Sequence, residues 1–332
     1  MSDNRLLLDV ENLHVEFRTD EETVYAVNGV SLKVAEGKTL GLVGETGAGK
    51  TTTAKALLRL TPKHNGYVTC DKLEVNEKAI MELSDAELEG MRGQDISMIF
   101  QDPMTALNPV MTVGEQIAES IRIHQKVDKK AAMKKAEEML ELVGIPAGRV
   151  HEYPHQFSGG MKQRVVIAIA LSCNPKILIA DEPTTALDVT IQAQVLELMK
   201  DLKAKYGTSM IMITHDLGIV AEVCDEVAVM YAGRIVERGT LSDVFRNTRH
   251  PYTEGLFNSL PNIKNRKDRL KPIPGLMPDP TVVPEGCAFA PRCSYATEAC
   301  FKKPPVERQV NETHFVVCDA YDDPDFRIER SK

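Results

Sequence analysis

One eight-residue segment constrains the fold of this chain more than any other. The segment GETGAGKT, residues 44–51, matches the pattern G-x-x-x-x-G-K-[ST]. The apolar run KTLGLV precedes it and predicts a buried strand over residues 38–43, and residues 51–60 have the composition of a helix. A glycine-rich loop that joins a buried strand to a helix is typical of an α/β protein that binds phosphate groups.

The residue types in this loop suit a phosphate ligand. Glycine allows backbone N–H groups to turn inward around an anion, and a helix that starts near Lys50 directs the positive end of its dipole to the same point. Lys50 adds a charge for the β- and γ-phosphates, and the Thr51 hydroxyl is a ligand for Mg²⁺. The candidate nucleotide-binding residues are Gly44, Glu45, Thr46, Gly47, Ala48, Gly49, Lys50, Thr51 and Thr52.

Two other apolar runs end in side chains that suit phosphate chemistry. ILIADEP, residues 177–183, predicts a strand with Asp181 and Glu182 at its C-terminal edge, where ligands bind in open α/β sheets. Asp181 is a candidate Mg²⁺ ligand, and Glu182 is a candidate for orienting or deprotonating an attacking water. MIMIT, residues 210–214, is followed by His215, which can bind a γ-phosphate and the water, or can simply neighbour a helix N-cap.

A second candidate anion site lies in FSGGMKQR, residues 157–164. Ser158 is a favourable N-cap, and Gly159 and Gly160 leave the start of the following helix open to a close neighbour. This helix start has no lysine comparable to Lys50, so it suits a γ-phosphate held by another copy of the domain.

Composition excludes several classes of protein. The chain of 332 residues has a formal net charge of −8, which argues against a general nucleic-acid binder. The N-terminus lacks the pattern of a signal peptide, and the longest apolar run, near residues 165–173, is half the length needed to cross a bilayer. We therefore expect a cytoplasmic protein that reaches a membrane only through partners and whose thiols stay reduced.

In this order the motifs resemble those of the nucleotide-binding subunits of ABC transporters. Residues 44–51 resemble the Walker A loop, 177–182 the Walker B strand, and 157–161 the signature, with Phe for the usual Leu and Met for the usual Gln. Three shorter motifs also correspond: Gln101 in FQDPMTALNP to the Q-loop, Ala186, Leu187 and Asp188 to the D-loop, and His215 to the switch histidine. The resemblance implies an α/β fold with a RecA-like P-loop NTPase core, an antiparallel β subdomain, and an α-helical subdomain at roughly residues 90–165.

The resemblance also implies the roles of these residues. ATP would lie between the Walker A loop of one subunit and Ser158, Gly159 and Gly160 of the other, in a head-to-tail dimer with Asp188 nearby. Thr51, Gln101 and Asp181 would surround Mg²⁺, while Glu182 and His215 would be catalytic. Tyr25 is the candidate for stacking on adenine, and Phe17 is the second candidate because the insertion TDEET blurs the alignment.

Longer segments resemble one branch of this family, the dipeptide, oligopeptide and nickel importers. They are GETGAGKTTTAKALLRL, FQDPMTALNP and HPYTEGLFNSLP, the last at residues 250–261. The resemblance implies an ATPase domain over residues 1–240 and a C-terminal extension over 241–332. It predicts a subunit at the cytoplasmic face of the cell membrane that energises peptide import. Its partners would be a second ATPase subunit, two permease subunits and an extracytoplasmic binding protein. The branch often uses a heterodimer of ATPases, and the intact motifs of this chain are also compatible with a homodimer.

Other functions stay open at this point. The cargo could be nickel chelates or oligosaccharides, because the binding protein and the permeases select it. A soluble ABC ATPase without a permease is a further alternative, against which stand the acidic composition and the HPYT segment.

Four cysteines mark the C-terminal extension: Cys287, Cys293, Cys300 and Cys318. The short C-x₂₋₄-C pairs of zinc sites and the tight ferredoxin run are both absent from the sequence. Wider spacing suits a cubane cluster, while zinc, disulfides and unligated thiols stay open as alternatives. The importer ATPases that this region resembles include members with a [4Fe–4S] cluster bound by such a quartet. We therefore expect a [4Fe–4S] cluster here, with a structural role in a small Cys-rich domain. A sensor that modulates transport is the alternative role for this cluster.

Overall fold

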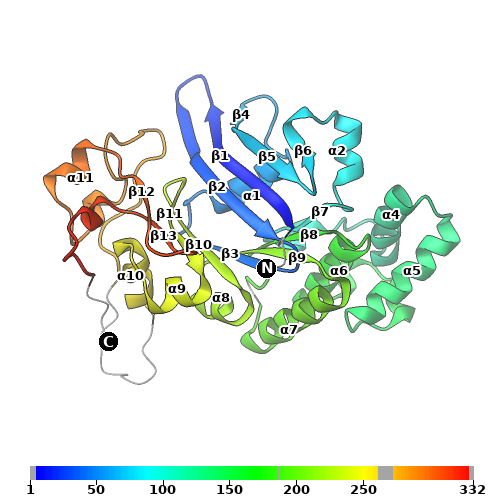
Figure 1. Ribbon diagram of the computed structural model, residues 1–332. Coiled ribbons are helices and arrows are strands. Elements are labelled where there is room, and N and C mark those ends of the chain that lie inside the picture. Colours follow the sequence, from blue (N-terminus) through cyan, green and yellow to red (C-terminus); the bar gives the residue numbers. More distant parts are fainter. Residues whose placement is uncertain (1–4, 186, 261–271, 329–332) are drawn as a thin grey trace. The chain divides into compact units, whose positions relative to one another are not determined.

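A computed structural model describes residues 5–185, 187–260 and 272–328 of the chain (Figure 1). These residues form two compact units, each assembled from separated segments. The first unit contains the N-terminal residues up to Asp9, Lys33–Thr39 and Leu73–Ile213. The second contains Val10–Leu32, Leu40–Lys72 and the residues from Thr214 onward.

In the second unit, a parallel strand pair carries the phosphate loop. Strand β3 (Thr39–Val43) is completely buried, pairs with β10 (Glu226–Tyr231), and leads through the loop into helix α1 (Lys50–Leu57). Strand β10 continues as a hairpin into β11 (Arg234–Thr240). The hairpin turns at Ala232 and Gly233, whose φ angles of 46° and 78° are those of a type I′ turn. The strand predicted over residues 38–43 is confirmed, and the helix predicted over residues 51–60 is present but ends at Leu57.

The N-terminal strands are longer than the sequence pattern suggests. The alternation of apolar and polar residues over 10–34 predicts several small antiparallel strands, but β1 (Leu6–Arg18) and β2 (Thr23–Ala35) are 13 residues each. Residues 19–22 of the TDEET insertion form the turn between them, where the Thr19 N–H donates to the Glu22 carbonyl (2.9 Å). Strand β4 (Gly66–Thr69) pairs antiparallel with β1.

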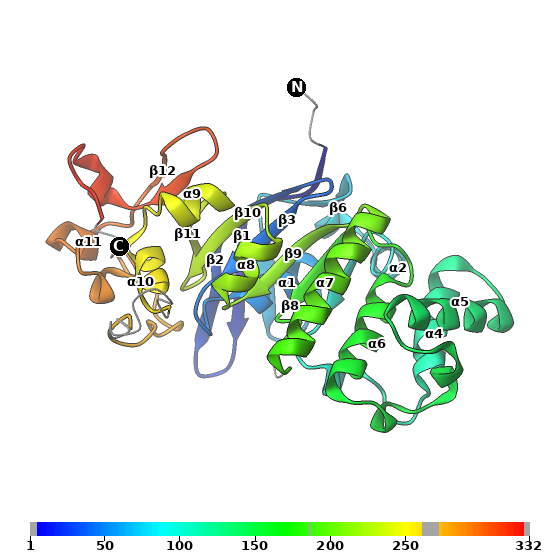
Figure 2. The same ribbon diagram turned by 90° about the horizontal axis from the view of Figure 1, so that it is seen from below.

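The first unit contains a parallel set of strands beside a group of helices. Strand β8 (Ile177–Asp181) pairs with β7 (Ile96–Ile99) on one side and β9 (Ser209–Thr214) on the other. Every residue of β8 and β9 is buried, as expected for central parallel strands. Figure 2 shows α4, α5 and α6 side by side. The helices of this unit are α2 (Asp85–Met91), α3 (Pro103–Ala106), α4 (Val113–Gln125), α5 (Lys129–Leu142), α6 (Gly159–Leu171) and α7 (Val189–Tyr206).

Helix α4 was not predicted, although its start has a clear sequence signal. Thr112 accepts a hydrogen bond from the Glu115 N–H (3.2 Å), and the Glu115 carboxylate accepts from the Thr112 N–H (3.2 Å). This capping box stabilises the first turn from both sides. Residues 126–143 have helical periodicity, but helix α5 begins only at Lys129, because Lys126 is left-handed (φ 52°) and Asp128 is the N-cap.

Buried polar contacts hold the C-terminal part of the second unit. The Glu237 carboxylate accepts from the N–H groups of Arg249 (2.7 Å) and His250 (2.9 Å) and contacts His314 Nε2 (2.8 Å). Burial raises the pKa of Asp243, but hydrogen bonds from Thr240, Thr313 and Asn311 outweigh it and lower that pKa to about 2. This part contains α8 (Leu217–Val223), α9 (Leu241–Arg246), α10 (Pro251–Asn258), α11 (Glu298–Lys302), β12 (Glu307–Gln309) and β13 (Phe315–Val317).

Within the described ranges, the structure contains no helix with the length and apolar character of a membrane span. The last residue of the HPYT segment, Pro261, and the D-loop residue Ala186 lie outside those ranges.

Candidate nucleotide-binding site

The phosphate loop has the geometry that its sequence predicts. The buried ammonium group of Lys50 donates to the carbonyl oxygens of Gly44 (2.7 Å) and Glu45 (3.0 Å). Gly49 is the N-cap of α1, so no side chain caps the first turn of this helix. The loop therefore combines a lysine ammonium group with an uncapped helix start, which is a favourable site for an anion.

Two glycines of the loop are required by close backbone contacts. Gly44 and Gly49 have φ angles of 155° and 102°, in the region that favours glycine. A Cβ at Gly44 would lie 2.1 Å from the Met230 carbonyl oxygen, and one at Gly49 would lie 2.4 Å from that of Ala26. Any larger residue would displace the loop, so these positions fix its shape.

In the first unit, the structure brings Gln101 and Glu182 together. Gln101 Nε2 donates to Glu182 Oε2 (3.0 Å), and the Thr185 hydroxyl donates to the same oxygen (2.9 Å). Glu182 also has a φ angle of 46°, which is unusual for a residue with a large side chain. Strained residues of this kind concentrate at functional sites. Asp181, the last residue of β8, is buried.

The sequence analysis does not predict the contact between Thr185 and Glu182. Thr185 follows the Walker B carboxylates in the polar run DEPTTALD. This polar run is the only local sequence feature that indicates a functional role for Thr185. Its hydroxyl and the Gln101 amide both donate to one carboxylate oxygen, so together they fix the orientation of the Glu182 side chain.

The signature segment presents an exposed helix start in the first unit. Ser158 caps α6, and its hydroxyl oxygen accepts from the Met161 N–H (3.4 Å). A Cβ at Gly160 would lie 2.5 Å from Cγ2 of Ile191, so a glycine is needed where α6 meets α7. Phe157, which replaces the usual leucine, is buried beneath the Arg149 guanidinium group (4.4 Å to the ring centroid).

Three other site candidates have the following surroundings. Asp188 is the exposed N-cap of α7 in the first unit. His215 is exposed in the second unit, and the N-cap of α8 is its neighbour Asp216, which accepts from the Gly218 N–H (2.7 Å). Tyr25 lines a pocket with Gly47 of the phosphate loop, and its N–H donates to the Pro280 carbonyl (2.8 Å). The catalytic role of His215, the adenine-stacking role of Tyr25 and the D-loop role of Asp188 therefore stay predictions.

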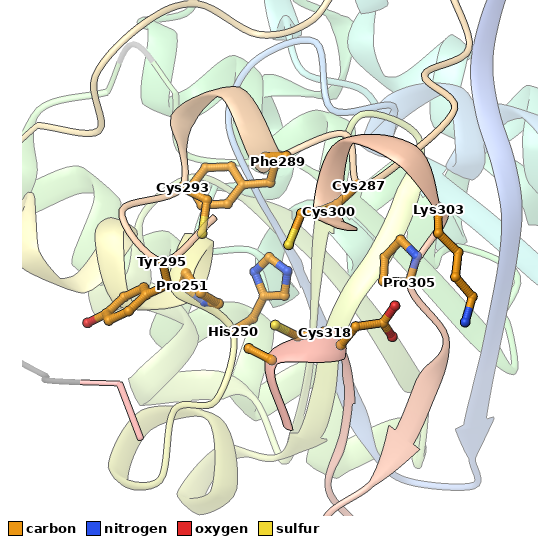
Figure 3. Close-up of a pocket in the computed structure, with 13 residues that line it drawn as sticks. His250, Pro251, Cys287, Phe289, Cys293, Tyr295, Cys300, Lys303, Pro305 and Cys318 are labelled. Atoms are coloured by element: carbon orange, nitrogen blue, oxygen red, sulfur yellow. The ribbon is translucent and has the colours of Figure 1, made fainter. Parts of the chain in front are cut away.

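The four C-terminal cysteines line one pocket, shown in Figure 3. All four are free thiols, and His250 and Phe289 line the same pocket. Burial raises the pKa of Cys293 to about 12 and that of Cys318 to about 11. Burial also lowers the pKa of His250 to about 3, so this imidazole is neutral.

The cysteine pocket lacks the geometry of a single-metal site. Among the described residues, no three His, Cys, Asp or Glu side chains are arranged to hold a metal ion. A zinc ion needs four ligands within about 2.3 Å of one point. The described residues therefore contain four free thiols in one pocket, with no preformed ligand group for zinc or for the expected [4Fe–4S] cluster.

Comparison with known proteins decides the family. A family model for ABC transporters matches residues 27–185, and a model for the C-terminal region of oligopeptide/dipeptide transporters matches residues 236–300. The oligopeptide transport ATP-binding protein OppD of Bacillus subtilis (strain 168) is 53% identical over 313 residues, which cover 93% of this chain and 87% of that protein. The chain belongs to the ATP-binding subunits of ABC transporters.

Further relatives agree with this assignment. The dipeptide transport ATP-binding protein DppD of Bacillus subtilis (strain 168) is 52% identical over 314 residues, which cover 94% of each chain. Among solved structures, the ATP-binding cassette MJ0796, a dimer bound to ADP and Pi, covers 70% of this chain and 98% of its own, with a TM-score of 0.61 and 28% identity. The ABC ATPase fold is therefore confirmed, and the protein is the ATP-hydrolysing subunit of a transporter.

Proposed function

We propose that this ABC ATPase energises the import of oligopeptides or dipeptides. The observation that carries the proposal is the match of residues 236–300 to the C-terminal region of oligopeptide/dipeptide transporters, because the ATPase core alone is common to many cargoes. Relatives named for peptide transport, of about half-identical sequence, support it.

In the proposed mechanism, hydrolysis is phosphoryl transfer to water, achieved by positioning and charge neutralisation. The phosphate loop and Lys50 bind the phosphates, and His215 contacts the γ-phosphate. Glu182, oriented by Gln101 and Thr185, holds the attacking water and accepts its proton. The residues that would hold Mg²⁺, which neutralises phosphate charge, are Thr51, Gln101 and Asp181.

The site is complete only in a dimer under this proposal. Ser158, Gly159 and Gly160 are exposed or half-buried at the start of α6, where they can contact the γ-phosphate of ATP bound to a second ATPase subunit. The dimeric state of the similar cassette supports this arrangement. We propose a heterodimer with a related ATPase, bound to two permease subunits at the cytoplasmic face of the membrane and supplied by an extracytoplasmic binding protein.

Uptake assays and affinity purification test the cargo and the partners. Cells that lack this chain should lose uptake of labelled oligopeptides or dipeptides, and the chain purified from detergent-solubilised membranes should retain two permeases. Loss of nickel or oligosaccharide uptake with normal peptide uptake would overturn the cargo. Recovery with ribosomes or nucleic acid and no permease would overturn the transport function.

We also propose that the cysteine pocket holds a [4Fe–4S] cluster. Four thiols that line a single pocket match the ligand number of a cubane. A cubane places its four iron atoms, and so its four ligands, farther apart than the ligands of one zinc ion, which suits the wide spacing of these cysteines in the sequence. The raised pKa values of Cys293 and Cys318 mean that these thiols must release protons when they bind the group.

Elemental analysis tests the cluster directly. The full chain purified without oxygen should contain about four iron and four acid-labile sulfide atoms and absorb near 400 nm. The variant Cys300→Ser should lose most of both. Cys173→Ser is the matched control, because Cys173 is half-buried in the first unit beside Ser120 and should leave the iron content unchanged. One zinc atom without sulfide, or no metal, would reject the cluster.

A further inference from the structure

An arginine from the C-terminal extension contacts the phosphate loop. Arg292 lies 247 positions from Glu45 in the sequence, in the short turn Ala290–Arg292. Its guanidinium group forms a two-pronged ion pair with the Glu45 carboxylate, Nη1 to Oε2 at 2.7 Å and Nη2 to Oε1 at 3.0 Å. Both residues belong to the second unit, and Glu45 directly follows the first glycine of the loop.

The arginine is held rigidly in a buried position. Its side chain is 5% exposed, whereas that of Glu45 is 30% exposed. Arg292 Nε donates to the Pro274 carbonyl (2.8 Å), and Nη1 lies 3.4 Å from the Tyr231 hydroxyl. The hydrogen bonds to Glu45 raise the pKa of Arg292 above its usual value. A buried guanidinium of this kind needs its carboxylate partner, so the pair constrains both segments.

A second contact holds the backbone of the same loop residue. The Glu45 N–H donates to the hydroxyl of Tyr252 (2.8 Å), which comes from the HPYT segment. The Tyr252 ring is fully buried and packs against Tyr231 (4.6 Å between centroids) and Phe289 (5.4 Å). The extension therefore fixes both the backbone and the side chain of Glu45.

This arrangement has an electrostatic consequence for nucleotide binding. A carboxylate in a loop that surrounds phosphates repels them, and the repulsion is strong where solvent is partly excluded. Arg292 neutralises this carboxylate and binds both of its oxygens. The Glu45 carbonyl also accepts a hydrogen bond from the Lys50 ammonium group, so the position of Glu45 affects the main phosphate ligand.

We propose that Arg292 is a positioning residue for ATP, through which the C-terminal extension sets the affinity of the phosphate loop. The inference rests on the proposed role of this loop as the nucleotide site. The turn that carries Arg292 lies between Cys287 and Cys293, and the Ala290 N–H donates to the Cys287 carbonyl (3.0 Å). A group bound by these thiols would be linked to the loop through Arg292.

Titration of the full chain with MgATP tests the proposal. Arg292→Gln should weaken ATP binding about 10-fold, because the Glu45 carboxylate is then uncompensated and repels the phosphates. Arg292→Lys keeps the charge without the planar fork, and should lose about 3-fold. The double variant Glu45→Gln with Arg292→Gln should regain most of the affinity, because the uncompensated carboxylate is gone. Arg238→Gln is the matched control, since Arg238 forms a similar two-pronged pair with Glu307 in the extension, outside the loop.

The outcomes separate the inference from the site on which it rests. Arg292→Gln with normal affinity would overturn the inference. The inference would also be overturned if the double variant did not regain the ATP affinity lost in Arg292→Gln, or if Arg238→Gln lost as much affinity as Arg292→Gln. Either result would indicate a general structural defect. If Arg292→Gln fails to fold, the Arg292→Lys titration decides, and unchanged affinity there would overturn the inference. Normal binding by Lys50→Ala would instead reject the phosphate loop as the site.

Discussion

Replacement of Lys50 by alanine should reduce ATP affinity at least about 100-fold. Its ammonium group is buried, lies against two carbonyl oxygens of the loop, and is the loop's own positive side chain. A hydrogen bond to a charged group contributes about 1.5–3 kcal/mol, and each 1.4 kcal/mol is tenfold in affinity. Two or more such bonds to phosphate oxygens account for the expected loss. Fluorescence or calorimetric titration with MgATP measures it.

Lys55→Ala is the matched control for this variant. Lys55 lies on the same helix, α1, but is exposed in its last turn, so its removal should leave ATP affinity within about 2-fold. Equal losses in both variants would indicate a general effect of charge or of helix stability. An unchanged affinity in Lys50→Ala would contradict the proposed phosphate site.

Replacement of Glu182 by glutamine should preserve ATP binding and lower hydrolysis at least about 100-fold. Loss of a general base typically costs 10²–10⁴-fold in rate. The amide has nearly the same shape, and its oxygen can still accept from Gln101 or Thr185, so local structure should persist. Because ATP would bind but not turn over, the protein and its partner ATPase should accumulate as a closed dimer, measurable by gel filtration with MgATP.

The control for this variant is Glu197→Gln, on the outer part of α7. The Glu197 side chain is 67% exposed and pairs with Lys200, so its loss should not change the rate. If Glu182→Gln hydrolyses ATP at the normal rate, Glu182 has no catalytic role. If Glu182→Gln loses ATP binding as well as hydrolysis, Glu182 has a structural role in the nucleotide site.

Several features could be predicted from local sequence alone. The phosphate loop, the buried strand before Asp181 and the Ser158 cap each depend on residues within about one helical turn or one strand. The spacing of glycines and apolar residues therefore determines them directly. Helix α4 could have been predicted in the same way, because Thr112 and Glu115 form a capping box.

Local patterns were less informative where one residue had two possible roles. His215 could have been an N-cap neighbour or a phosphate ligand. The structure assigns the N-cap to Asp216, which leaves His215 exposed at the end of β9. The two long N-terminal strands were also misjudged, since alternation alone does not indicate how far a strand continues before its turn.

By itself, the sequence determined the α/β class and the chemistry of the phosphate loop, because these depend on short-range spacing. The resemblance of its motifs to those of ABC ATPases implied the rest of the ATPase fold. Only the tertiary structure decided which distant side chains meet. Gln101 contacts Glu182 across 81 positions, and Arg292 contacts Glu45 across 247. No periodicity encodes such pairs. They depend on how strands and turns from separate parts of the chain pack, and on the requirement that a buried charge has a partner.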